Sequence, residues 1–260
     1  MEPTLEKQAE HKHEETPLEA FASICGVLVV GLFVLTFIFQ NFAIPSSSMV
    51  KALLVGDHVL VDRSTLAPAA HWAHGVIYHR NVERGDIVVF HKPTLEANGE
   101  HLFLVKRVMG IPGDRIHLSG GVVYRNGAAL NEPYAAQPPY PDYNPYRDDF
   151  PAVPPGDNAD VTAEWGEALP SHIENGDLVV PAGMYFCMGD NRMVSLDSRF
   201  WGFVPRANIV GRPMFVYWSF ETPESEQYKT SASDRISWIL HETIHFFDQT
   251  RWRRTFHLVK

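Results

Sequence analysis

Uncharged apolar residues form one long block near the start of the chain, from Ala20 to Phe39. At a helical rise of about 1.5 Å per residue this block spans about 30 Å, the thickness of a bilayer's hydrocarbon core. A cleavable signal peptide fits less well, because residues 1–19 are acidic and the apolar core is longer than such peptides use. A buried helix of a soluble protein is the other alternative. The pattern predicts a membrane helix over residues 20–40, preceded by a disordered polar tail.

Beyond this block the pattern changes to short apolar runs separated by turn residues. Four of these runs follow a Gly-Asp pair, with the glycines at Gly56, Gly85, Gly113 and Gly176. Each pair indicates a turn that leads into a strand. The run 122–125 is followed by Asn-Gly, which favours a two-residue hairpin turn. Closely spaced short strands predict a mainly β fold, an antiparallel sheet or partial barrel carried on one N-terminal transmembrane helix.

Two segments depart from the β pattern. Residues 131–175 are rich in proline, which predicts an exposed insertion that adds no strand to the core. Residues 221–234 are polar, and the chain from Arg235 onward is amphipathic and ends basic. The predicted parts are a tail at 1–19, a membrane helix at 20–40, a catalytic β domain at 41–220 with the insertion at 131–175, and a C-terminal region at 221–260.

Composition narrows the possible functions. The chain has 22 Lys and Arg against 31 Asp and Glu, a formal charge of -9, which argues against a nucleic-acid partner. Cys25 lies in the apolar block and Cys187 lies in a distant apolar run, so no internal disulfide is expected. We predict neither a cofactor nor a metal.

Candidate chemistry begins at the serines that follow the apolar block, within residues 45–49. A serine hydroxyl is a weak nucleophile and needs a base that is neutral at working pH. Lysine serves as that base only where burial lowers the pKa of its ammonium group. Lys106 lies in a strand-like run in which Leu104 and Val108 share its face. A strand lysine more often extends to water, but the combination with Ser48 and Ser195 favours a general base.

Other residues around these two have predicted supporting roles. The backbone N–H of Ser48 and the hydroxyl of Ser46 can stabilise an oxyanion, each contributing on the order of 3–4 kcal/mol. Ser195 is expected to hydrogen-bond the neutral lysine and orient it. Asp197 and Arg199 are expected to form a salt bridge that fixes the loop carrying Ser195.

A second lysine competes for the role of base. Ser48 and Lys51 fit S-x-x-K, the pattern of class A β-lactamases and penicillin-binding proteins. That pattern also requires S-D-N and K-T-G elements. The chain offers only Gly-Asp-Asn at 189–191 and Lys-Thr-Ser at 229–231, and neither matches.

Four motifs, in this order, resemble the bacterial type I signal peptidases, which are membrane-anchored Ser-Lys leader peptidases. They are P-S-x-S-M at 45–49, R-G-D-I-V-V-F at 84–90, K-R-V-x-G-x-P-G-D at 106–114 and G-D-N-R-x-x-S-x-D-S-R-x-W-G at 189–202. The resemblance implies that Ser48 is the nucleophile, Lys106 the general base and Ser46 part of the oxyanion hole. It also implies that Ser195 positions the lysine and that Met49 lies beside the substrate groove.

The resemblance has further implications for activity and location. It implies cleavage of the signal peptides of exported pre-proteins after an A-x-A-like site, with shallow apolar pockets for the small side chains. Membrane lipid and signal peptides would be the partners. It places the β domain on the periplasmic or outer side of the bacterial cytoplasmic membrane, an orientation that the acidic tail leaves open. The chain departs from the family pattern at residues 50–53 and at Met193 and Val194.

The sequence leaves three further functions open. Residues 241–245 fit H-E-x-x-H, which on a helix could bind zinc with Glu242 as base, although an ordinary amphipathic helix is the simpler explanation. A membrane-tethered β module without catalysis would present the insertion to a partner. A self-cleaving repressor of the LexA type would need a DNA-binding domain, whose place the apolar block takes here.

Overall fold

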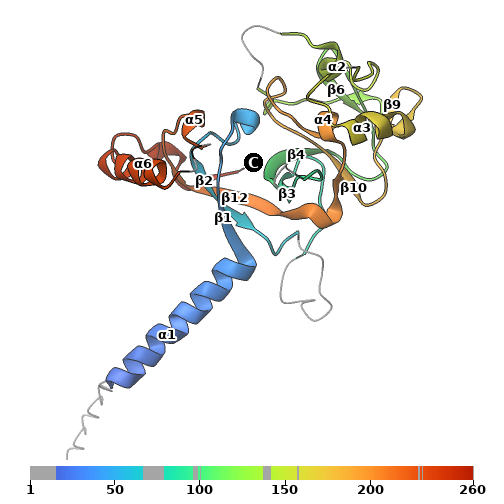
Figure 1. Ribbon diagram of the computed structural model, residues 1–260. Coiled ribbons are helices and arrows are strands. Elements are labelled where there is room, and N and C mark those ends of the chain that lie inside the picture. The colour runs from blue at the N-terminus through green and yellow to red at the C-terminus, as the bar shows by residue number, and fades with distance from the viewer. Residues whose placement is uncertain are drawn as a thin grey trace, which may run out of the picture.

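The structure is a computed structural model that describes residues 16–66, 79–95, 99, 101–136, 142–156, 158–227, 229 and 231–259. One long helix, α1, projects from a β domain made of two antiparallel sheets (Figure 1). The predicted mainly β, antiparallel fold is therefore confirmed. Most of the predicted tail 1–19 lies outside the described residues.

Helix α1 (Pro17–Phe33) continues through a π-helical turn to Ile38. It begins three residues before the predicted start, because Thr16 and Glu19 form a reciprocal capping box. Among the described residues, one helical segment is long and apolar enough to cross a membrane, the 22 residues of Pro17–Ile38, and none of its apolar window is buried. The predicted helix ends slightly too late, because residues 39–43 form a strand instead.

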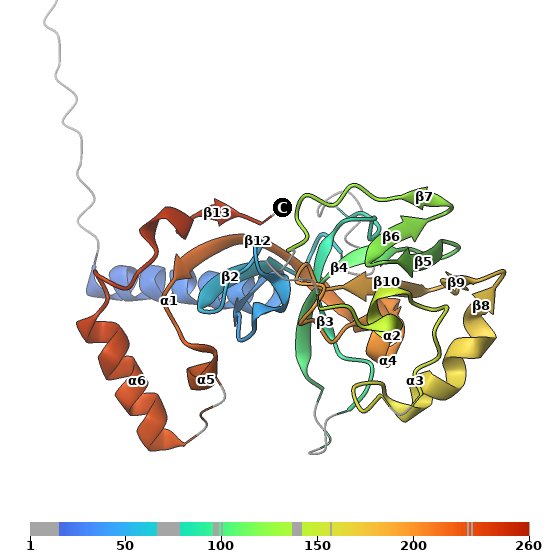
Figure 2. The ribbon, with the colours of Figure 1, turned by 90° about the horizontal axis from the view of Figure 1, so that it is seen from above.

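The larger sheet has eight strands in the order β1-β2-β12-β3-β4-β10-β11, with β13 also paired to β12. Its strands are β1 (Phe39–Ala43), β2 (Asp57–Asp62), β3 (Ile87–His91), β4 (Phe103–Gly110), β10 (Met184–Met188), β11 (Val204–Pro205), β12 (Ile209–Ser219) and β13 (His257–Leu258). Strand β12 pairs with β3 through its first residues and with β2 through its last, and its register shifts in both pairings. Such irregularities bend a strand, so the sheet curls into a half-barrel (Figure 2).

The smaller sheet has five strands in the order β7-β6-β5-β9-β8. Its strands are β5 (Arg115–Ser119), β6 (Val122–Arg125), β7 (Ala128–Ala129), β8 (Ile173–Glu174) and β9 (Asp177–Val179). All four strands predicted after Gly-Asp pairs are present, as β2, β3, β5 and β9. The predicted hairpin turn is also present, because Asn126 and Gly127 both have the positive φ that a type I′ turn requires.

The remaining helices are short, apart from the last one. They are α2 (Pro145–Asp148), α3 (Ala163–Ala168), α4 (Ser198–Trp201), α5 (Glu224–Gln227) and α6 (Ala232–Ile244). The prediction that residues 131–175 are exposed and add no strand to the core is wrong. Tyr146, Phe150 and Trp165 from this insertion are buried in the main core, and β8 joins the smaller sheet. Large aromatic side chains bury too much apolar surface to stay in solvent, so they outweigh the proline content of the segment.

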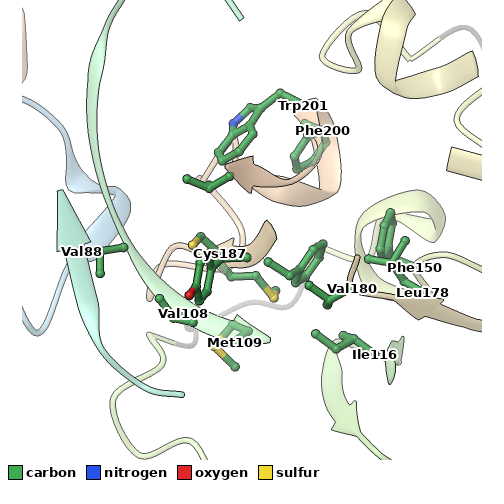
Figure 3. Packing of buried hydrophobic residues seen from close by; sticks show 14 of the residues in the cluster. Val88, Val108, Met109, Ile116, Phe150, Leu178, Val180, Cys187, Phe200 and Trp201 are labelled. Carbon is green, nitrogen blue, oxygen red and sulfur yellow. The ribbon is translucent and has the colours of Figure 1, made fainter. Parts of the chain in front are cut away.

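Two apolar clusters hold the sheets together. The main cluster joins the two sheets: Figure 3 shows Val88 and Val108 of the larger sheet close to Cys187, with Ile116 and Leu178 of the smaller sheet beyond it. The second cluster fills the half-barrel and includes Met49. The segment carrying Ser48 is therefore anchored in an apolar core.

A substitution at Gly211 tests how closely β12 and β2 approach each other in the half-barrel. A Cβ at this position would lie 2.2 Å from the backbone oxygen of Asp62, and a strand backbone cannot move aside easily. We expect Gly211→Ala to lower the free energy of unfolding by about 1–3 kcal/mol. Thermal unfolding of the detergent-solubilised chain measures this.

Gly166 in α3 provides the control for that variant. A Cβ added at Gly166 would have its nearest neighbour 3.7 Å away, which is an ordinary van der Waals contact. Gly166→Ala should be neutral or stabilise by about 0.5–1 kcal/mol, because alanine favours a helix. Equal unfolding midpoints for the two variants would contradict the close approach of β12 and β2.

Candidate active site

The predicted nucleophile lies in the connection between β1 and β2. Ser46 has an extended backbone, and Ser47–Met49 form one short 3-10 turn. Ile44 and Met49, on either side of the serines, are buried in the cluster that fills the half-barrel. These two apolar side chains hold the connection against the sheet, so the hydroxyl of Ser48 has a fixed position.

Strand β4 brings the predicted base to this serine. Lys106 Nζ lies 2.7 Å from Ser48 Oγ, and the lysine is only 3 % exposed. Burial lowers the pKa of Lys106 from 10.5 to about 8, although the carboxylate of Asp197 favours the charged form and opposes that change. The structure thus brings together two residues that are 58 positions apart in the chain.

The second predicted oxyanion donor lies beside the same hydroxyl. Ser46 Oγ donates a hydrogen bond to Ser48 Oγ at 3.3 Å. The extended backbone at Ser46, with φ of -134° and ψ of 157°, is what lets both side chains point the same way. The three polar groups of Ser46, Ser48 and Lys106 therefore form a continuous chain.

The loop that follows β10 holds the serine segment from the other side. The backbone N–H of Asn191 donates to the carbonyl of Ser48 at 3.0 Å, and the Asn191 side chain donates to the carbonyl of Ser47 at 3.2 Å. Sequence reasoning assigned no role to Asn191. Its signal was its place in the same G-D-N-R motif that leads to Ser195.

Ser195 is buried next to this contact, but its predicted hydrogen bond to Lys106 is absent. Among the described residues Ser195 Oγ has no hydrogen-bond partner, whereas Lys106 Nζ donates to Ser48 Oγ. Gly189 separates the two serines: a Cβ there would lie 2.3 Å from Ser195 Oγ and 2.7 Å from the backbone oxygen of Ser48. Only glycine allows these segments to approach so closely.

Asp197 and Arg199 form the predicted salt bridge. Both side chains are fully buried, and two guanidinium nitrogens each lie 2.9 Å from a carboxylate oxygen. Although burial by itself raises the pKa of Asp197, the charge and hydrogen bonds of Arg199 keep that pKa below its usual value. Asp197 also accepts the backbone N–H of Gly189 at 3.0 Å, so this pair fixes both ends of the loop.

A second buried ion pair lies beside the lysine and was not predicted. Arg107 donates to both carboxylate oxygens of Asp190, at 2.8 and 2.7 Å. Sequence reasoning placed Arg107 on the face opposite Lys106, which is correct, but it did not foresee that this face is also buried. The pair ties β4, which carries Lys106, to the loop after β10, which contacts the serine segment.

An apolar groove opens at the serine. It has a volume of about 290 Å³, and its lining combines the serine segment with the start of β4. Met49, predicted to lie beside a substrate groove, contributes to this lining together with Phe42 and Leu104. The groove is therefore a concave, mostly apolar surface next to the hydroxyl of Ser48.

The S-x-x-K alternative does not agree with the geometry. The 3-10 turn ends at Met49, so Ser48 and Lys51 share no helical face. Lys51 is exposed, and its Nζ donates to the backbone oxygen of Ala135 at 2.6 Å. Its contact is with the insertion and not with Ser48.

The H-E-x-x-H segment lies on α6, away from the serine. His241 contacts Gln249, His245 contacts Asp248, and Glu242 accepts a hydrogen bond from Trp238 at 2.7 Å. Across the part of the chain that is described, no group of three or more His, Cys, Asp or Glu residues is arranged to hold a metal. The segment is an ordinary part of an amphipathic helix.

Comparison with known proteins agrees with this geometry. The profile of the family described as signal peptidase, peptidase S26 matches residues 18–218. Signal peptidase I of Leptolyngbya laminosa is 33 % identical over 83 % of this chain and 87 % of its own length. Signal peptidase I of Bacillus caldolyticus is 32 % identical over 84 % of this chain and 97 % of its own length.

A solved structure is also similar. The crystal structure of a signal peptidase I from Enterococcus faecalis is 31 % identical and covers 51 % of this chain and 97 % of its own chain, with a TM-score of 0.37. The family profile covers well over half of the chain, and the two sequence relatives match most of it. This chain is therefore a member of the signal peptidase I family of S26 serine peptidases.

Proposed function

We propose that this protein removes signal peptides from exported pre-proteins with Ser48 as nucleophile and Lys106 as general base. The observation that carries this proposal is the 2.7 Å separation of Lys106 Nζ and Ser48 Oγ inside a buried site. Family membership supports signal-peptide removal, and the geometry supports the roles of the two residues.

In the first step the neutral amine of Lys106 takes the hydroxyl proton as Ser48 Oγ bonds to the carbonyl carbon of the substrate. The carbonyl π electrons move to the oxygen, which becomes an oxyanion. The hydroxyl of Ser46 and the backbone N–H of Ser48 stabilise that charge. Lys106 then gives its proton to the leaving nitrogen, the C–N bond breaks, and an acyl-serine ester remains.

In the second step water replaces the leaving peptide. Lys106, neutral again, takes a proton from the water as its oxygen attacks the ester carbon, and the proton passes to Ser48 Oγ as the ester bond breaks. Ser195 acts as a positioning residue, because its buried hydroxyl has no partner among the described residues and can accept a hydrogen bond from the transient ammonium. Asp197 and Arg199 hold the loop on which it lies.

The groove gives a physical reason for a preference for small side chains. Its volume of about 290 Å³ is at the lower end for ligand sites, and apolar residues such as Met49 and Phe42 contribute to its lining. A bulky or charged side chain next to the scissile bond would clash there or lose its hydration. Signal peptides with small residues before the cleavage site fit this lining.

The chain also carries the features of a membrane-anchored enzyme. We assign residues 20–40 to the membrane anchor, 41–220 to the catalytic domain and 221–260 to a C-terminal region. The helical segment Pro17–Ile38 supports the first assignment by its length and hydropathy. A catalytic domain on the outer side of the bacterial cytoplasmic membrane would meet signal peptides as they emerge. The rival, a tethered module without catalysis, has no support from the family.

The central test is incubation of the detergent-solubilised protein with a pre-protein. We expect a shortened product whose new N-terminus follows an A-x-A-like site. Ser48→Ala should give no such product while remaining folded, because it loses the nucleophile but keeps the segment's apolar anchors. N-terminal sequencing of the product decides; a product of the same length from Ser48→Ala would disprove the assignment.

The two lysines near the serine should differ in their effect. Lys106→Ala should lower kcat/KM by about 10²–10⁴-fold, the usual contribution of a general base. Lys51→Ala removes a similar side chain whose contact is with the backbone of Ala135, so most activity should remain. Equal losses of processing in the two variants would count against Lys106 as the base.

Activity should depend on the protonation of Lys106. Burial lowers the pKa of this lysine to about 8, and only the neutral amine can accept the proton of Ser48. We therefore expect kcat/KM to be small below pH 7 and to rise as pH passes through about 8. A flat or falling profile from pH 6 to 9, in an enzyme that circular dichroism shows to be folded, would exclude a lysine base.

A further inference from the structure

Helix α6 presents an apolar face that no part of the described chain covers. Four residues of the helix and one just after it recur at helical spacing, and they are 59–79 % exposed: Ile236, Ile239, Leu240, Ile244 and Phe247. At 100° per residue the four isoleucine and leucine side chains within α6 lie on one side of the helix, and Phe247 follows just beyond its end. A continuous apolar stripe of this size on a protein surface marks a contact with something else.

The opposite side of α6 accounts for how the helix is held. Trp238 and His241 stack on each other and both contact the ring of Phe220, which is fully buried. The helix therefore packs on the domain through its aromatic and polar side. The apolar stripe is left facing outward.

The residues after α6 fix it to the half-barrel. Arg254 Nε donates to the buried carboxylate of Asp57 at 3.1 Å, and β13 pairs with β12. Trp252 lies between the helix and this anchor, with its ring stacked on Phe247. The stripe thus continues into an exposed aromatic side chain, a residue type that is common at the boundary between lipid and water.

The position of α6 relative to α1 indicates the occupant of this face. Both helices leave the β domain on the same side in two perpendicular views (Figures 1 and 2). In Figure 1 a plane drawn perpendicular to α1 at the end nearest the sheet runs close to α6. If α1 crosses a bilayer, that plane is the outer lipid surface.

The charges near α6 suit this location. The chain as a whole has a formal charge of -9, whereas residues 231–259 hold four arginines against three acidic residues. Arg235 and Arg253 are exposed, one near each end of the segment. Basic residues that flank an apolar stripe favour the surface of a membrane with anionic headgroups.

We propose that α6 is a second membrane contact, which lies flat in the outer lipid surface with the stripe from Ile236 to Phe247 buried among the acyl chains. It would hold the catalytic domain at a fixed angle to the membrane, in addition to the tether of α1. The family profile ends at residue 218, so this contact belongs to the part of the chain beyond the shared region. The proposal rests on the membrane anchoring proposed above.

The test uses the full-length protein in vesicles of phosphatidylcholine and phosphatidylglycerol, with one nitroxide label per molecule. The labelled sites are the native Cys25 in α1, Leu240→Cys on the stripe and Val122→Cys on β6, the last two with Cys25→Ser. Cys187 is fully buried and does not compete for the label. Power saturation of the nitroxide signal compares how often the label collides with oxygen, which enters lipid, and how often it collides with a water-soluble nickel chelate.

We expect the oxygen-to-nickel accessibility ratio at Leu240 to exceed that at Val122 severalfold and to approach that at Cys25. Ile239→Glu should return the Leu240 label to the aqueous ratio, because it puts a charge in the stripe. Ser237→Glu adds the same charge beside the stripe and should not.

Three results would overturn the proposal. A Leu240 ratio equal to that at Val122, with Cys25 still in lipid, would show an anchored enzyme whose α6 stays in water. An aqueous ratio at Cys25 would remove the membrane anchor and this contact with it. Dipolar broadening between Leu240 labels that grows with the protein-to-lipid ratio would show that the stripe binds a second copy instead.

Discussion

The site depends on one amine kept away from water. Lys106 is almost completely buried, and burial is the largest cause that lowers its pKa to about 8, against the opposing charge of Asp197. A solvated lysine would hold its proton at neutral pH and could not accept one from Ser48. Three nearby elements keep the amine buried. Strand β4 supplies it, the serine segment covers it, and the loop after β10 supports that segment.

That enclosure is built from charged groups as well as apolar ones. Two buried ion pairs, Arg107 with Asp190 and Arg199 with Asp197, lie beside the lysine. Buried pairs contribute little net stability, because desolvation cancels much of their attraction, but losing one partner is costly. Their main effect is therefore to fix the position of the loop after β10. They hold the loop near Gly189 so closely that no side chain fits between Ser195 and the carbonyl of Ser48.

The proposed membrane contacts extend the same logic to the substrate. The central region of a signal peptide is apolar, so an enzyme held at a fixed angle to the lipid surface would be well placed to receive it. Helix α1 alone would tether the domain but leave its tilt free. A second contact through α6, fixed to the half-barrel by Arg254 and β13, would restrict that tilt and keep the groove near the lipid.

Local patterns in the sequence were enough to predict the apolar helix, the strands after the Gly-Asp pairs, the hairpin turn and the two residues of the proposed dyad, because each depends on neighbouring residues or on a short motif. Tertiary contacts decided the rest. Tyr146 and Trp165 are buried although their segment is rich in proline, and Asn191 supports the serine across 143 positions of chain. Ser195 has no hydrogen bond to Lys106, although both residues are buried at the site. Such outcomes depend on which distant segments pack together, and no local pattern records that.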